Sequence, residues 1–137
     1  MTIRVFTDGG ARGNPGPAGA GAIIYNNDTV VGTVSEYLGR QTNNVAEYEA
    51  LILALTKARE LHKNISDEEV HVFMDSELIV KQMKKEYKVK DAKLKQQYAK
   101  VESIIAESFP SISFMHIRRE QNVEADALAN DAMDRGV

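Results

Sequence analysis

The order in which strand-like and helix-like patterns follow one another most constrains the fold of this 137-residue chain. Strand patterns cover residues 3–8, 19–25, 29–38, 69–75 and 112–117. Helical spacing of apolar residues covers residues 43–62, 76–85, 92–108 and 122–134. The order βββαβααβα predicts an α/β fold with a five-stranded mixed sheet flanked by helices, in which the first three strands are antiparallel and the first, fourth and fifth are parallel.

Composition is that of an ordinary globular protein, with 43% hydrophobic and 27% charged residues. The length predicts a single domain over residues 1–137. No apolar run approaches the roughly 20 residues of a membrane span, and the N-terminus lacks the apolar segment of a signal peptide. The absence of cysteine excludes disulfides and thiolate metal sites. We therefore expect a cytoplasmic protein with no membrane partner, and a monomer by default.

Charge is unevenly distributed, although the net charge is only −3. Residues 81–100 contain eight lysines and two acidic residues, which gives this segment a net charge of +6. Such a segment can contact a phosphate backbone. The lysines alone favour the simpler interpretation, a solvated helical face.

Two strand-ending aspartates share a local pattern. Asp8 follows Phe6 by two residues and Asp75 follows Phe73 by two, so each Asp lies on the same strand face as its Phe. If the two strands are parallel neighbours, the carboxylates lie side by side at the sheet edge where open α/β folds place ligands. The two glycines after Asp8 predict a sharp turn that leaves this carboxylate uncovered.

Glu47 and Asp126 fall in the first turns of predicted helices, near the apolar stripe. Each of the four carboxylates has a simple structural interpretation: Asp8 as a turn former, Glu47 in a capping box with Asn44, Asp75 as a helix cap, and Asp126 at a positive helix end. Together they suggest another role. Clustered like charges cost stability unless divalent cations with hard oxygen ligands neutralise them, and two such ions can catalyse phosphoryl transfer.

Four motifs surround these carboxylates. They are Thr7-Asp8-Gly9-Gly10 with Gly13-Asn14-Pro15-Gly16, then Thr42-Asn43-Asn44-Val45-Ala46-Glu47, then Asp75-Ser76, then Arg119-Glu120-Gln121-Asn122-Val123-Glu124-Ala125-Asp126. In this order, and over essentially the whole chain, they resemble the type 1 ribonuclease H family. The resemblance implies the ribonuclease H-like fold, a five-stranded mixed sheet with flanking helices, which agrees with the order of elements above.

The resemblance also implies an activity and a metal. The reaction would be endonucleolytic hydrolysis of the RNA strand of an RNA–DNA hybrid, leaving 5′-phosphate and 3′-hydroxyl ends. The implied cofactor is Mg²⁺, two ions in the active complex, with Mn²⁺ as a possible substitute. By resemblance, Asp8 bridges the two ions, Asp126 helps to hold the ion that activates water, and Glu47 and Asp75 hold the ion at the leaving oxygen.

Substrate contacts carry over from the same motifs. The backbone around Gly10, together with Glu47, resembles the family's contacts to 2′-hydroxyl groups, by which RNA is told from DNA. Thr42 resembles its DNA-phosphate contact at a helix start. Asn14, Asn43 and Asn44 match amides that touch the minor groove of the hybrid, and turn or cap chemistry is compatible with that role.

Three features depart from the family pattern. Glu77 stands where members often have Gln, and Glu cannot donate a hydrogen bond to a base. Many members have a loop His that helps the product to leave, and here we favour Arg119 over His116 because His116 falls in or at the end of a strand. The chain has no Trp and no room for a basic protrusion, so we hypothesise that lysines of the +6 segment share the phosphate contact. Those lysines are Lys84, Lys85 and Lys88.

Three other classes of protein agree less well with the sequence. Another metal-dependent nuclease of the ribonuclease H-like superfamily would keep an acidic cluster, but not the Gly-Asn-Pro-Gly loop and the asparagines before Glu47. A non-catalytic hybrid-binding module would avoid clustered carboxylates beside phosphates. A nucleotide-binding protein would need a phosphate-binding glycine motif, and neither G-x-x-x-x-G-K-[ST] nor G-x-G-x-x-G occurs.

Overall fold

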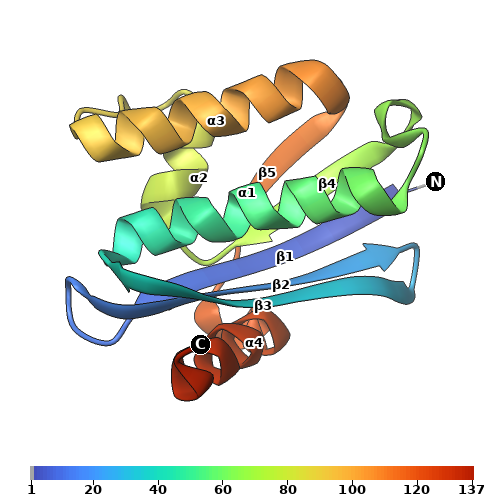
Figure 1. Ribbon diagram of the computed structural model, residues 1–137. Coiled ribbons are helices and arrows are strands. Elements are labelled where there is room, and N and C mark those ends of the chain that lie inside the picture. The colour runs from blue at the N-terminus through green and yellow to red at the C-terminus, as the bar shows by residue number, and fades with distance from the viewer. Residues whose placement is uncertain (1) are drawn as a thin grey trace.

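The structure, a computed structural model, describes residues 2–137 and contains a five-stranded sheet in the order β3-β2-β1-β4-β5 (Figure 1). The strands are β1 (Thr2–Ala11), β2 (Gly16–Asn26), β3 (Thr29–Gln41), β4 (Glu69–Met74) and β5 (Ile112–His116). The helices are α1 (Asn43–Leu61), α2 (Glu77–Met83), α3 (Ala92–Ser108) and α4 (Val123–Arg135). Two single-turn 3₁₀ helices, Ile65–Asp67 and Arg119–Gln121, were not predicted.

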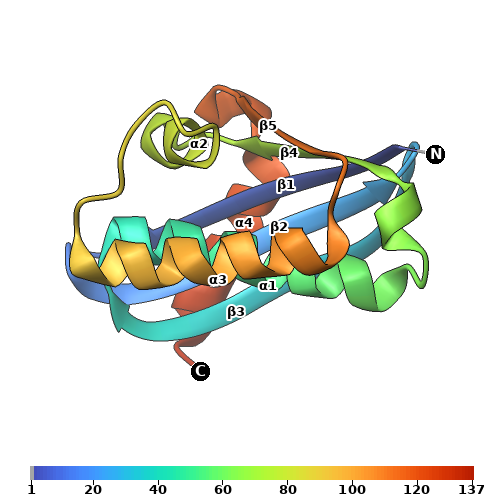
Figure 2. The same cartoon turned by 90° about the horizontal axis from the view of Figure 1, so that it is seen from above.

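Strand directions confirm the predicted mixed sheet. β2 is antiparallel to both β1 and β3, whereas β4 is parallel to both β1 and β5. α1, α2 and α3 lie on one face of the sheet and α4 crosses the other (Figures 1 and 2). Within residues 2–137, no helix combines the length and the apolarity that crossing a membrane requires.

The core lies between the sheet and the layer of α1 and α3. Alternate residues of β1 and β4 face it, and α1 contributes a stripe that includes the fully buried Leu51 and Leu55. Burial of such a side chain contributes about 1.5–3 kcal/mol. This contact fixes α1 along β1, with the first turn of the helix beside the carboxyl end of the strand.

The predicted turn after Asp8 is wrong. β1 continues through both glycines to Ala11, and β2 begins at Gly16 instead of residue 19, so the turn occupies residues 12–15. Gly9 serves another purpose, because a β carbon there would overlap the carbonyl group of Ala46. A glycine inside a strand often marks such a close backbone approach, and here it lets α1 lie directly on β1.

A second close approach brings α4 onto the opposite face. Gly21 pairs with Asp8 in the β1–β2 ladder, and a β carbon at Gly21 would overlap the carbonyl group of Ala125. The hydroxyl of Ser35 in β3 donates to the Leu128 carbonyl at 2.7 Å and ties α4 to the sheet. The first turn of α4 therefore lies over the carboxylate end of β1.

Candidate active site

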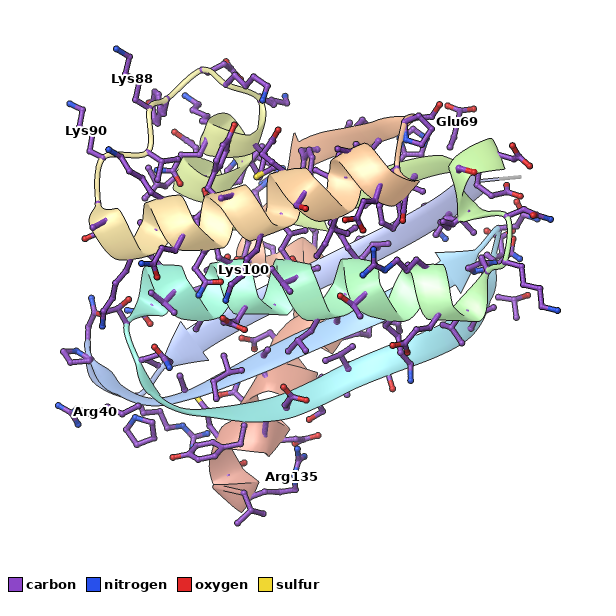
Figure 3. The ribbon with its side chains drawn as sticks, turned by 45° about the horizontal axis from the view of Figure 1, so that its top comes forward. Arg40, Glu69, Lys88, Lys90, Lys100 and Arg135 are labelled. Atoms are coloured by element: carbon purple, nitrogen blue, oxygen red, sulfur yellow. The ribbon has the colours of Figure 1, made fainter. Side chains whose placement is uncertain are left out.

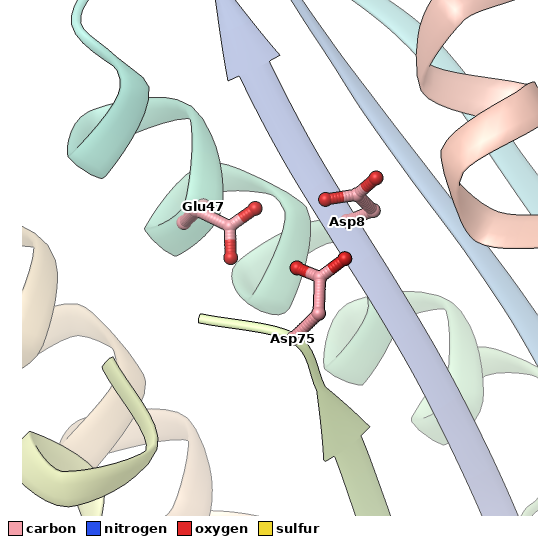
Figure 4. A group of neighbouring side chains, drawn as sticks. All are labelled: Asp8, Glu47 and Asp75. Atoms are coloured by element: carbon pink, nitrogen blue, oxygen red, sulfur yellow. The ribbon is translucent and has the colours of Figure 1, made fainter. Parts of the chain in front are cut away.

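Three of the four predicted carboxylates converge at the carboxyl edge of the sheet (Figure 4). Asp8 lies near the end of β1, Glu47 lies in the first turn of α1, and Asp75 follows β4 directly. Each offers one carboxylate oxygen, and these three oxygens lie within 4.8 Å of one another. Asp8 and Glu47 are only 9% and 6% exposed, so neither charge is well solvated.

The side-by-side placement of Asp8 and Asp75 follows from strand register. Thr7 pairs with Met74 in the parallel β1–β4 ladder, and the two aspartates come next on their strands. Two residues earlier on each strand, the rings of Phe6 and Phe73 stack with centroids 4.7 Å apart, so the paired strands present equivalent residues to the same face. The two strands thus deliver equivalent carboxylates to one point.

Glu47 is held in place by the backbone of β1. The Gly9 N–H donates to Glu47 Oε1 at 2.6 Å, a buried hydrogen bond between residues 38 positions apart. The absent side chain at Gly9 makes this contact possible, because α1 can then approach the strand. The alternative interpretation of Glu47, a capping box with Asn44, does not apply: Thr42 is the N-cap of α1, and its hydroxyl accepts from the Val45 N–H at 3.3 Å.

Burial makes the cluster costly in its ionised form. It raises the pKa of Asp8 to about 10, and the charges of Glu47 and Asp75 add to the effect. It raises the pKa of Glu47 to about 7, although the hydrogen bond from Gly9 opposes the rise. Burial also raises the pKa of Asp75, opposed by a hydrogen bond from Asn122 and by the charge of Arg119.

These residues fit a divalent cation. Glu47 Oε2 is buried with no hydrogen-bond partner, and one oxygen of the same carboxylate lies within 4.8 Å of oxygens of Asp8 and Asp75. A hard cation would satisfy this oxygen and offset the mutual repulsion that raises the pKa values of the cluster. The carboxylate-only donor set suits Mg²⁺ or Mn²⁺.

Asp126 joins the same cleft from α4. It lies in the first turn of that helix and lines a cleft of about 390 Å³ together with the other three carboxylates. It is not one of the three residues whose oxygens lie within 4.8 Å of one another. A hydrogen bond with Asp126 contributes to the raised pKa of Asp8, so the two side chains are neighbours.

Arg119 and His116 occupy different positions relative to this cleft. Arg119 begins the short 3₁₀ helix before α4 and lines the cleft, and its charge opposes the rise in the pKa of Glu47 and Asp75. His116 is the last residue of β5, as its predicted strand position requires, and does not line the cleft. Of these two residues, Arg119 is therefore the one whose charge lies at the carboxylate cleft.

The predicted substrate residues divide between two adjoining clefts. Gly10, Asn43 and Asn44 line the carboxylate cleft. Asn14 and Thr42, again with Asn44, line a cleft of about 290 Å³. Hydrogen bonds order this region: Asn14 Oδ1 accepts from the Asn43 N–H at 3.1 Å, and Asn43 Oδ1 accepts from the Ala11 N–H at 2.8 Å. The two motifs predicted to contact substrate thus support one another.

The second of these clefts lies at two helix starts. Asp91, the N-cap of α3, and Lys93 in its first turn line it opposite Thr42, the N-cap of α1. The free N–H groups of helix starts and the charge of Lys93 favour an anion there, whereas the carboxylate of Asp91 opposes one.

Glu77 and the three predicted lysines lie around α2 and the segment that follows it. Glu77 begins α2, is exposed and pairs with Lys81 at 3.4 Å, so it does not line the carboxylate cleft. Lys85 donates to the Tyr98 hydroxyl at 3.1 Å and to Glu102 at 3.2 Å, which ties it to α3. Lys88 extends outward from the segment between α2 and α3 (Figure 3).

The lysines therefore have different surroundings. Lys85 and Lys88 line a cleft of about 410 Å³ that also includes Lys95. Lys84 lines a different cleft, with apolar side chains of α3 and β5. Of the three predicted lysines, Lys85 is held by its contacts with α3, whereas Lys84 and Lys88 are exposed.

Two amides near the carboxylates were not predicted as site residues. Asn130 lines the carboxylate cleft one helical turn after Asp126, and its amide donates to the Asp126 carbonyl at 3.0 Å. Its i+4 spacing from Asp126 is a signal that could have identified it. Asn122 is buried beside Asp75 and lies one helical turn before Asp126, so the same spacing could have indicated it, although its contact with Asp75 could not be predicted.

Comparison with known proteins agrees with this geometry. A family profile described as reverse transcriptase-like matches residues 6–132. LC11-RNase H1, isolated from compost, is 50% identical in sequence and superposes with a TM-score of 0.93. The superposition covers 98% of this chain and 96% of LC11-RNase H1. The same protein, solved in complex with an RNA/DNA hybrid, gives a TM-score of 0.94 and covers 97% of each chain.

Curated relatives extend the comparison. The bifunctional protein Rv2228c of Mycobacterium tuberculosis is 43% identical over 136 residues, which are 98% of this chain but 36% of that protein. Ribonuclease HI of Halobacterium salinarum is 35% identical over 96% of this chain and 64% of its own length. The chain thus spans about a third of the first of these relatives and under two thirds of the second. On fold, motifs and these likenesses together, the chain belongs to the type 1 ribonuclease H family, in a form without the basic protrusion.

Proposed function

We propose that this protein is a ribonuclease H, an endoribonuclease that hydrolyses the RNA strand of RNA–DNA hybrids and leaves 5′-phosphate and 3′-hydroxyl ends. The observation that carries the proposal is the convergence of three carboxylate oxygens within 4.8 Å, from β1, α1 and β4, in a cleft that Asp126 and Arg119 also line. A relative that is 50% identical over nearly the whole chain has been solved with an RNA/DNA hybrid, which supports the substrate.

Asp8, Glu47, Asp75 and Asp126 would hold two Mg²⁺ ions, or Mn²⁺ in their place. When bound, the ions supply the Lewis acidity that activates a water and stabilises the leaving oxygen. The chain's own residues prepare this site. The Gly9 N–H fixes the orientation of Glu47, and burial keeps bulk water from screening the carboxylates.

Substrate binding follows from the residues around the carboxylates. Gly10, Asn43 and Asn44 line the cleft and offer backbone and amide groups to the minor groove of the hybrid. In the adjoining cleft, Thr42 would contact a DNA phosphate, and Asn14 would offer its amide to the minor groove. Arg119 would bind the phosphate beside the cut and assist its departure. Glu77 is exposed and paired with Lys81, so its part in base contact stays a prediction.

One assay separates this proposal from its alternatives. Matched RNA–DNA, RNA–RNA and DNA–DNA duplexes, labelled on each strand in turn, are incubated with the protein and Mg²⁺. The proposal expects cutting of RNA in the hybrid alone. Cutting of DNA would indicate another nuclease of the ribonuclease H-like superfamily, and tight hybrid binding without cutting would indicate a non-catalytic binding module.

A further inference from the structure

The side chain of Asn122 is buried between three of the elements that carry the carboxylates. The residue is 1% exposed and lies between the 3₁₀ helix Arg119–Gln121 and α4. An Asn at the start of a helix usually caps it, yet this side chain makes no capping hydrogen bond. Its position therefore needs another explanation.

The Asn122 amide nitrogen links β1 to the residue that ends β4. Nδ2 donates to the Thr7 carbonyl at 2.8 Å, one residue before Asp8. The side chain also hydrogen-bonds to the Asp75 carboxylate. An amide nitrogen carries two hydrogens, so one side chain can serve both acceptors.

The backbone of Asn122 adds the third element. Its carbonyl group accepts from the Asp126 N–H at 3.0 Å, which is the first hydrogen bond of α4. One residue thus touches Asp75 directly, Asp8 through its neighbour, and Asp126 through the helix it starts. Meanwhile Asn122 Oδ1 is buried with no partner, a cost that a side chain serving only the fold would avoid.

We propose that Asn122 is a positioning residue for the divalent-ion site: its amide orients the Asp75 carboxylate toward Asp8 and Glu47 and sets the affinity of the cluster for the ion. The inference rests on the proposed function, because it presumes that the carboxylates hold a cation. Partners that orient metal ligands in this way typically contribute ten- to a hundredfold to metal affinity.

The test is Mn²⁺ binding by titration calorimetry and by the electron paramagnetic resonance of free Mn²⁺, on the whole chain without substrate. Asn122→Leu keeps the approximate volume but removes both donated hydrogen bonds, and Asn122→Ser keeps a hydroxyl donor. We expect the Mn²⁺ dissociation constant to rise about tenfold or more in Asn122→Leu and less in Asn122→Ser. At limiting Mg²⁺ the cleavage rate should fall, while saturating Mg²⁺ restores it and the KM for the hybrid stays unchanged.

Gln82→Leu is the matched control. Gln82 is a buried amide that accepts from the Tyr48 hydroxyl at 2.6 Å, and it does not line the carboxylate cleft. Its loss should lower thermal stability and leave the Mn²⁺ affinity unaltered. Unchanged Mn²⁺ affinity in folded Asn122→Leu, or failure of both Asn122 variants to fold, would overturn the inference. If the wild-type chain itself binds no Mn²⁺, the proposed function fails instead.

Discussion

Gly9 is the residue on which the position of Glu47 depends. Its N–H holds the Glu47 carboxylate, and its missing side chain admits the backbone of α1. A glycine next to a strand-ending carboxylate suggests a turn, which is why the sequence alone predicted one here. Only the packing of α1 on β1, a contact between residues far apart in the chain, reveals that the glycine is needed for close approach.

Gly9→Ala should therefore destabilise the protein by about 3 kcal/mol, because the new β carbon would overlap the Ala46 carbonyl group. Relieving that overlap would require the backbone of α1 to move away from β1. Gly10→Ala is the matched control. A β carbon at Gly10 meets nothing within 4 Å, so its effect should stay below about 1 kcal/mol. Denaturant unfolding of both variants measures this, and equal stabilities would contradict the close-approach account.

Asp8→Asn should abolish hydrolysis and make the metal-free protein more stable. The substitution keeps the shape of the side chain but removes a buried carboxyl group that, near pH 8, must either stay protonated at a cost in free energy or carry a charge that the other carboxylates repel. Since each unit of pKa difference corresponds to about 1.4 kcal/mol, we expect a gain of roughly 1–3 kcal/mol near pH 8. Unfolding in the presence of EDTA checks it, and a destabilised Asp8→Asn would assign Asp8 a structural role.

At the scale of elements, the sequence predicts most of the architecture. Changes of apolar period located every strand and the four main helices, and the shared Phe-x-Asp pattern placed Asp8 and Asp75 together. Element ends were less predictable. Gly9, Gly10 and Gly16 were expected in a loop, although pairing with neighbouring strands holds them in β1 and β2.

The residues of the candidate site likewise divide into those that the sequence predicts and those that only the structure reveals. Carboxylates are recognisable because each ends a strand or begins a helix, so topology brings them together. Asn122 is not recognisable in this way, because its role depends on contacts with Thr7 and Asp75, both distant in sequence. Likewise, the lysines look equivalent in sequence, and only structure shows that Lys85 is bound to α3.

The segment between α2 and α3 should contribute to hybrid affinity through Lys88. Lys88→Gln should raise the KM for the hybrid and reduce the slope of log affinity against log salt concentration by about 0.7–0.9, the value for one phosphate contact. Lys100→Gln, an exposed substitution on α3 that removes the same charge, serves as the control. Identical salt slopes for the two variants would show that the segment is only a solvated surface.

At the scale of the whole molecule, the carboxylate cluster should make the stability of the metal-free protein fall as pH rises. The pKa values of Asp8 and Glu47 are raised to about 10 and about 7, so the folded chain holds protons that the unfolded chain releases above about pH 4. Unfolding therefore becomes more favourable as pH increases through this window. Denaturant unfolding at pH 5 and pH 8 in EDTA measures the loss.

Two comparisons assign this pH dependence to the cluster. Asp8→Asn should show a smaller loss of stability between pH 5 and pH 8 than the wild type, because one of the raised groups is gone. Saturating Mg²⁺ should restore the stability of the wild-type protein at pH 8, since a ligand that binds only the folded state stabilises that state. A pH dependence that is the same in Asp8→Asn would place its origin elsewhere in the molecule.

Cleavage of an RNA–DNA hybrid with each strand labelled in turn is the most direct test of the central claim, that these carboxylates form a metal-dependent ribonuclease centre. With Mg²⁺, the wild-type protein should release RNA fragments with 5′-phosphate and 3′-hydroxyl ends and leave the DNA strand intact. EDTA or Asp8→Asn should stop the reaction. Undiminished cleavage in EDTA or by Asp8→Asn, or no cleavage by the wild-type protein at saturating Mg²⁺, would contradict the account.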